Sequence, residues 1–257
     1  MSASITIKAD PAVQYLLRIG DTALVWAQRT SEWTGHAPVL EEDIALANIA
    51  LDLVGQARAV LTLAGQVEGA GHDEDQLAFL RDERDFRNVT LVELPRGDFA
   101  VTVLRNTMMS TFFRLLWERL QQSANAELAA IAGKAVKEAR YHQQHSADWL
   151  VRLGQGTEES ARRLAAAVDQ LWRYGPELFA GDDVDRHAAS TGLGAAWADL
   201  ADAWDAEMAQ LFGAAGLQLP PATKFLSTGK QGRHSEHMGY LLAEMQYLQR
   251  AYPGGAW

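Results

Sequence analysis

Cysteine is missing from this sequence of 257 residues. Its absence excludes disulfide bonds, thiolate nucleophiles and thiolate metal ligands, and it fits a reducing compartment. The first residues, MSASITIKADP, contain no apolar run of the kind found in a signal peptide. No window approaches 18 uninterrupted apolar residues, so we predict no membrane-spanning segment and expect a cytoplasmic protein.

Positive charge is also scarce. Lysine and arginine total 23 against 33 aspartate and glutamate residues, which gives a formal net charge of −10. Because nucleic acids and anionic membranes repel an acidic surface, neither is expected as a partner. An anionic ligand would need a local group of basic side chains. The 48% share of hydrophobic residues is enough for a sizeable core.

Strand-like alternation is nearly absent, and the nearest candidate, Val89–Leu94, is only six residues long. Apolar residues recur instead at helical spacing, with no internal repeat and no linker long enough to divide the chain. We predict an all-α fold: a ferritin-like four-helix bundle with additional packed helices, in one domain over residues 1–257. The predicted helices are Pro11–Trp33, Val39–Gln66, Phe99–Gln122, Asn125–Leu153, Thr157–Phe179, Leu193–Ala215 and Ser235–Arg250.

The second of these segments carries two apolar stripes at helical spacing. Two stripes predict burial on most sides, so this helix is expected at the centre of the bundle. The first stripe consists of Leu40, Ile44, Ala47, Leu51, Val54 and Leu61, and the second of Leu46, Ile49, Leu53, Ala57 and Val60.

A metal-binding bundle of this plan needs Glu-x-x-His, because residues three apart share one helix face and can reach one ion. No aspartate or glutamate in this sequence is followed by histidine at that spacing, and residues 99–117 contain no carboxylate. In the stretch KEARYHQQHSADW, Glu138 precedes Tyr141, and His142 follows Ala139. We interpret the chain as a bundle that lacks the ligands of a di-iron site.

Other histidine spacings leave an alternative open. Glu138 and His142 lie four residues apart, and His234 and His237 lie three apart, so each pair can share a helix face. A metal-dependent oxygenase could use these four residues. The competing interpretation is that they are hydrogen-bonded histidines of ordinary structural type.

The densest basic group is RDERDFRN, which places Arg81, Arg84 and Arg87 around Phe86. One interpretation is a solvated turn whose arginines pair with neighbouring acids. The other is contact with a phosphorylated ligand, because guanidinium groups match phosphate oxygens.

Several stretches resemble one known family, the C subunits of the phenylacetyl-CoA 1,2-epoxidase. They include EWTGHAP, DIALANIALDLVGQAR, LAFLRDERDFRN, LWRYGPELF and HSEHMGYLLAEMQYLQR, and they extend from about Tyr15 to Trp257. The resemblance implies a ferritin-like, non-catalytic subunit that supports a catalytic A subunit holding the di-iron site. It also implies a B subunit and an NADPH-dependent reductase with flavin and an iron–sulfur centre, in a heteromeric complex of phenylacetate catabolism.

Comparison with a metal-binding relative places Leu53 and Gln56 where glutamate and histidine would stand in the second helix. Ala139 and His142 occupy the corresponding places in the fourth. The resemblance therefore implies that this chain binds no metal or other cofactor. We expect Gln56 and His142 to face each other, with Asp52 satisfying a neighbouring group.

The resemblance also suggests two kinds of contact. Association with the catalytic subunit should occur through helix faces, with exposed tryptophan or tyrosine at the centre of a large apolar contact. Contact with the CoA part of phenylacetyl-CoA is expected at the end of the arginine-rich connection, and a second, weaker candidate is an acidic loop. These CoA-contact candidates are Asp85, Phe86, Arg87 and Asn88, then Arg186 and His187.

Overall fold

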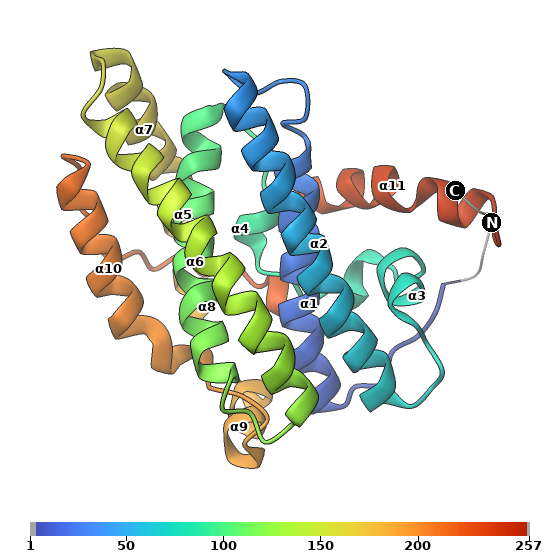
Figure 1. Ribbon diagram of the computed structural model, residues 1–257. Coiled ribbons are helices and arrows are strands. Elements are labelled where there is room, and N and C mark those ends of the chain that lie inside the picture. Colours follow the sequence, from blue (N-terminus) through green and yellow to red (C-terminus); the bar gives the residue numbers. More distant parts are fainter. Residues whose placement is uncertain (1–3, 256–257) are drawn as a thin grey trace. The chain divides into compact units, whose positions relative to one another are not determined.

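The computed structural model describes residues 4–255, which form helices joined by turns and loops. Within this range no strand forms, and Thr228 and Arg233 make an isolated β-bridge. The all-α prediction is therefore confirmed for the described residues. The helices fall into two compact units (Figure 1). One runs up to Pro95 and resumes at Thr228, and the other is Arg96–Ser227. A single domain over the whole chain stays a prediction.

The first unit is built on a pair of long helices, α1 and α2, which lie side by side (Figure 1). The turn between them is short, so they run antiparallel. The helices of this unit are α1 (Pro11–Ser31), α2 (Leu40–Glu68), α3 (Glu74–Phe79), η1 (Glu83–Asp85), α4 (Thr90–Glu93), η4 (Gly229–Gln231) and α11 (Glu236–Ala251).

Helix α1 begins where the sequence predicts it. The Asp10 side chain accepts hydrogen bonds from the backbone N–H groups of Ala12 and Val13, at 2.8 and 3.2 Å, and Pro11 occupies the first helical position. An acceptor followed by proline satisfies the unpaired first-turn donors without losing a needed N–H. The short α4 replaces the only strand candidate, so residues 89–94 are not a strand.

Helix α2 differs from the sequence prediction. The stripe that contains Leu53 and Val60 is buried, as expected. Most of the other stripe is exposed: Leu40 is 72%, Ile44 54%, and Leu51 68% exposed. The prediction of a helix buried on most sides is therefore wrong, because periodicity shows which residues share a face but not what that face meets.

Among the described helices, α2 alone has the length and apolar composition that crossing a membrane requires. Of its most apolar window, 44% is buried. A core helix of a soluble protein passes the same test, and α2 packs along α1. Its composition therefore gives no indication of a membrane by itself.

The second unit also contains a pair of long helices, α5 and α6, which pack against each other. Ser110 of α5 and Ser146 of α6 lie 3.1 Å apart between their hydroxyl oxygens, a buried hydrogen bond across the pair. Each unit thus contains one antiparallel pair of long helices. The helices of this unit are α5 (Phe99–Leu120), α6 (Ala126–Gly154), α7 (Glu158–Leu171), η2 (Trp172–Tyr174), α8 (Pro176–Phe179), α9 (Asp183–Thr191), η3 (Trp197–Leu200) and α10 (Ala201–Ala214).

Two segments of the second unit depart from prediction. The helix expected over residues 157–179 ends at Leu171, and a 3₁₀ turn leads into the separate helix that Pro176 begins. Proline lacks the N–H that a continuous helix needs at this point. The expected acidic loop at residues 181–187 instead enters α9, because the Asp182 side chain caps the backbone N–H groups of Val184 and Asp185.

Most tryptophan side chains belong to the core, as the sequence suggests. Trp26, Trp117, Trp197 and Trp204 are at most 2% exposed, and Trp257 lies outside the described residues. The large exposed aromatic side chains are tyrosines: Tyr141, Tyr240, Tyr247 and Tyr252.

Candidate functional site

The positions that the resemblance matches with metal ligands lie inside the protein. Leu53 and Gln56 are buried on α2, and Ala139 and His142 are buried on α6. Leucine and alanine offer no donor atom to an ion, so these positions do not fit a di-iron site. Because α2 and α6 belong to different units, the expectation that Gln56 faces His142 stays a prediction.

The alternative metal site does not form as proposed. Among residues 4–255, no group of three or more His, Cys, Asp or Glu side chains could hold an ion. His234 uses both ring nitrogens: Nδ1 lies 2.7 Å from a Glu93 carboxylate oxygen and Nε2 lies 3.1 Å from the carbonyl oxygen of Phe86. With both nitrogens engaged, His234 has none left for a metal. His237 is only partly buried, with Nε2 at 3.9 Å from Glu236.

The arginine-rich connection is not a basic surface patch. Arg81 is fully buried, and its Nη1 donates to Asp21 at 2.9 Å and to the carbonyl oxygen of Asp85 at 3.0 Å. Nη2 donates to the second oxygen of the Asp21 carboxylate, so the pair is bidentate. The same carboxylate accepts the backbone N–H of Arg87 at 2.8 Å. One buried acid on α1 therefore organises this connection.

The same geometry holds the side chains of three residues that the sequence analysis expects to contact CoA. Phe86 is fully buried beneath the Arg81 guanidinium, whose Cζ lies 4.3 Å from the ring centroid, and Asn88 is fully buried as well. Neither side chain reaches the surface, so contact of these two residues with a nucleotide stays a prediction. Arg87 donates from Nε to Gln14 at 2.5 Å and from Nη1 to the carbonyl oxygen of Arg84 at 2.6 Å. Burial lowers the pKa of Arg87, and the negative charge of Asp21 opposes this effect.

The remaining CoA-contact candidates are Asp85 in the first unit and Arg186 and His187 in the second. Asp85 is half-buried in η1. Arg186 is exposed on α9 and pairs with Asp183 in the preceding turn, and His187 accepts the Thr191 hydroxyl through its carbonyl oxygen at 2.8 Å. Contact of these side chains with CoA stays a prediction.

A second buried group joins the C-terminal segment to α4. The Glu93 carboxylate accepts from the Asn88 amide at 3.0 Å, from the Ser235 backbone N–H, and from His234. Burial lowers the pKa of His234. The hydrogen bond and the negative charge of Glu93 raise this pKa by a larger amount, so the net shift is upward. The residues immediately before α11 are thus fixed by a buried histidine–glutamate pair.

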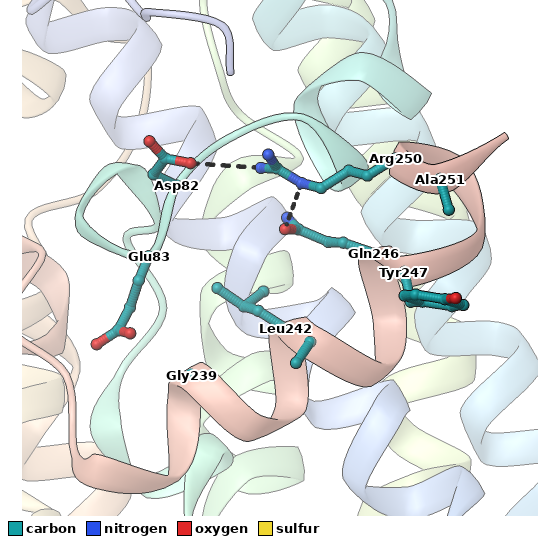
Figure 2. A pocket seen from close by; sticks show the side chains of 9 residues that line it. Asp82, Glu83, Gly239, Leu242, Gln246, Tyr247, Arg250 and Ala251 are labelled. Carbon is teal, nitrogen blue, oxygen red and sulfur yellow. Dashed lines mark hydrogen bonds and ion pairs between the residues drawn. The ribbon is translucent and has the colours of Figure 1, made fainter. Parts of the chain in front are cut away.

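Beside this group, α11 and the arginine-rich connection form an open groove of about 600 Å³ (Figure 2). Leu242 lies on its floor, and Tyr247 on one edge. Arg250 reaches from α11 to the carbonyl oxygen of Arg81 at 2.8 Å and toward Asp82 at 3.5 Å. Because this arginine is already engaged, the exposed charges are mainly those of Asp82 and Glu83, so the groove is unsuited to phosphate.

The second unit has its own groove of about 600 Å³, which the sequence analysis did not anticipate. Trp172 and Trp204 stack there with ring centroids 5.4 Å apart, and Trp204 donates from its indole nitrogen to the carbonyl oxygen of Met108 at 3.0 Å. Asp205 lies at the edge, where burial and then the charge of Asp202 raise its pKa. Aromatic spacing alone did not show that these rings would line a groove rather than only the core.

Comparison with known proteins identifies relatives over the full length of the chain. A family model described as phenylacetic acid catabolic protein matches residues 2–257. The C subunit of the 1,2-phenylacetyl-CoA epoxidase of Escherichia coli (strain K12) is 48% identical over 243 residues. That alignment covers 95% of this chain and 98% of the relative.

Proposed function

Because the chain belongs to the phenylacetic acid catabolic protein family and shares its all-α, ferritin-like fold, we propose that it is a non-catalytic subunit of a phenylacetyl-CoA 1,2-epoxidase. Its role is to bind and support a catalytic subunit in the aerobic breakdown of phenylacetate. A relative that matches nearly end to end and is itself a subunit supports this role. The proposed place of action is the cytoplasm.

One observation carries the non-catalytic part of the proposal. Two of the four positions that would supply Glu-x-x-His ligands hold Leu53 and Ala139, which are at most 1% exposed and have no donor atom. A buried carboxylate is costly unless a partner such as a bound metal ion compensates its charge. Leucine and alanine need no such partner. The buried surface around these residues is suited to helix packing and not to metal binding.

The chemistry is then assigned to partner chains. The catalytic A subunit would hold the di-iron centre that activates dioxygen for ring epoxidation. A reductase with flavin and an iron–sulfur centre would deliver electrons from NADPH, and a small B subunit would complete the complex. For this chain the proposal requires a protein contact, and obligate contacts of this kind commonly bury more than about 2,000 Å² in total.

The test begins with metal binding by the chain alone. The purified chain is incubated anaerobically with ferrous iron, desalted, and analysed for bound iron. We expect far less than one iron per chain. Near-stoichiometric iron together with oxygenase activity of this chain and reductase alone would refute the non-catalytic assignment.

The second arm measures association. The chain is co-expressed with the A-type subunit of its own organism, and the two are followed through affinity purification and gel filtration. We expect co-elution, iron in the catalytic chain, and phenylacetyl-CoA-dependent NADPH oxidation that requires both chains and the reductase. Failure of the two chains to associate at micromolar concentration would refute the accessory role, whatever the outcome of the iron measurement.

A further inference from the structure

The start of α11 is attached to the first unit by a buried histidine and a buried glutamate. The side chains of His234 and Glu93 are fully buried, and Nδ1 of His234 lies 2.7 Å from a Glu93 carboxylate oxygen. The other ring nitrogen, Nε2, lies 3.1 Å from the carbonyl oxygen of Phe86. Both nitrogens therefore face oxygen atoms that accept hydrogen bonds. Because a neutral imidazole has one N–H and an imidazolium has two, this geometry fits the charged form.

The Glu93 carboxylate has the surroundings of an ionised group. One oxygen accepts from the Asn88 amide at 3.0 Å, and the other accepts the backbone N–H of Ser235. Hydrogen bonds from such donors favour the charged form of a carboxylate. Ser235 is the N-cap of α11, so one carboxylate binds both the histidine and the start of the helix. Loss of a proton from His234 therefore weakens the attachment of α11 at its first turn.

The far end of α11 is attached by groups that do not titrate near neutral pH. The Gln246 side-chain amide donates to the carbonyl oxygens of Ala78 and Arg81, at 3.1 and 3.0 Å. Arg250 donates from Nε to the carbonyl oxygen of Phe79 at 3.0 Å. An amide side chain has no titration in this range, and arginine stays charged. The two ends of α11 therefore differ in how their attachment responds to pH.

We propose that the His234–Glu93 pair is a pH-sensitive switch that controls how often the first half of α11, residues 236–244, opens. While the imidazolium is present, this half stays packed, with Met238 and Leu242 buried. After loss of the proton, one ring nitrogen faces an oxygen atom with no hydrogen between them, and the charge pairing with Glu93 is gone. The first half of α11 then opens locally more often, without unfolding of the whole unit.

The charges around His234 decide the pH at which the switch acts. Burial lowers the pKa of His234, but Glu93, the Phe86 carbonyl group and Glu83 together raise it by more. The positive charge of Arg87 opposes this shift, because its Nη1 donates to the same carbonyl oxygen of Phe86 at 2.8 Å. The attachment is therefore strongest below the ordinary histidine pKa of 6.5 and weakens as pH rises through the folded pKa. The other charged groups of the adjoining segments are Arg29 of α1, which donates to the Glu93 carbonyl oxygen, Arg84 and Asp85 of η1, Lys230 and Arg233 before α11, and Glu236 and His237 within it.

The same switch acts on the groove beside α11 (Figure 2). Gly239 and Leu242 line the groove from the first half of the helix, and Glu83 lines it from the connection. A Cβ atom added at Gly239 would lie 3.2 Å from a Glu83 carboxylate oxygen, so the helix passes close to this acid. Opening of the first half of α11 therefore removes one wall of the groove.

Amide hydrogen exchange of the full-length chain between about pH 6 and pH 9 tests the proposal, with rates corrected for exchange in an unstructured chain. We expect the opening equilibrium constant of residues 236–244 to rise by up to about tenfold per pH unit while His234 titrates, and then to level off. Low concentrations of urea separate local opening from global unfolding. They should accelerate exchange in α1 more than in residues 236–244, because local opening exposes less surface.

Variants identify the titrating group. His234→Gln should remove the pH dependence of opening and leave residues 236–244 as open at low pH as they are in the wild type at high pH. Glu93→Gln should move the profile to lower pH, because it removes the charge that favours the imidazolium. The matched control is His237→Gln. His237 is partly exposed in the first turn of α11, with Nε2 at 3.9 Å from Glu236, and its replacement should leave the profile unchanged.

Nitrogen-15 NMR of the wild-type chain with labelled histidine measures the ring directly. The signals of His234, identified by their loss in His234→Gln, should show two protonated ring nitrogens at about pH 6 and a pKa above the ordinary value. A single protonated nitrogen at that pH would overturn the proposal. So would exchange in residues 236–244 that is independent of pH, that keeps its pH dependence in His234→Gln, or that has the urea dependence of α1. All of these measurements use the chain alone, so their outcome is independent of the proposed function.

Discussion

Replacement of Arg81 by methionine should destabilise the first unit strongly. The change removes a bidentate partner from Asp21 and leaves a fully buried carboxylate with the backbone N–H of Arg87 as one remaining donor. It also removes the Nε hydrogen bond to the carbonyl oxygen of Leu77, at 2.5 Å. Breaking one side of a buried ion pair typically costs about 3–5 kcal/mol. Total stabilities are commonly about 5–15 kcal/mol, so this loss is a large fraction.

The assay should report on the first unit by itself. Amide hydrogen exchange of α1, followed by mass spectrometry, measures the free energy of opening where Asp21 resides, and α5 provides an internal comparison in the other unit. A loss of about 3 kcal/mol corresponds to exchange more than about 100 times faster for the most protected amides. The matched control is Arg84→Met, an exposed arginine of the same connection, which should change the free energy by less than about 0.5 kcal/mol.

A double-mutant cycle separates the charge pair from loss of packing. Asp21→Asn retains an acceptor for the Arg87 N–H but removes the buried negative charge. Combined with Arg81→Met, it should cost less than the sum of the single changes by about 1–3 kcal/mol, because the double variant has no uncompensated ion. Equal exchange rates in α1 for wild type and Arg81→Met, or strict additivity in the cycle, would show that the buried pair does not organise this unit.

Two further predictions follow from other buried positions. The raised pKa of His234 beside Glu93 stabilises the fold fully below the ordinary histidine pKa of 6.5, and this stabilisation should be lost as pH rises through the folded pKa. His234→Gln should abolish that part of the pH dependence in urea unfolding, and an unchanged profile would contradict it. Gly65→Ala should destabilise the protein, because the new Cβ would overlap the backbone oxygen of His72. Gly133→Ala, with no atom within 4 Å of its Cβ, should instead stabilise by about 0.5–1 kcal/mol in thermal unfolding, and equal effects would refute the distinction.

Local signals in the sequence predict the helices well. The Asp10–Pro11 cap predicts the start of α1 because capping depends on neighbouring residues and little else. By contrast, the sequence predicts Asp182 to be part of an acidic loop, whereas in the structure its carboxylate caps α9. The same residue types favour turns and helix starts, so composition alone does not decide between them.

The role of the arginine-rich connection could not be predicted from the sequence, for a different reason. Arg81 and Asp21 are 60 positions apart, and no local pattern indicates that one will neutralise the other inside the protein. A basic group seen in sequence is therefore compatible with a phosphate site or with an internal ion pair. The structure shows the internal ion pair of Arg81, and that pair depends on tertiary packing, which local sequence does not report.

Helix α2 has two different sides: one carries Leu53 and Gln56, which the resemblance matches with metal-ligand positions, and the other is apolar and exposed. Leu53 and Gln56 lie on its buried side, and Leu51 and Val54 lie on the opposite, exposed side. An apolar residue on the buried side maintains helix packing without an ion, whereas an unpaired carboxylate there would cost several kcal/mol. An apolar residue on the exposed side has no such benefit in an isolated chain, because it gains stabilisation only when another surface covers it. Both sides of α2 are therefore suited to packing against other apolar surfaces of protein.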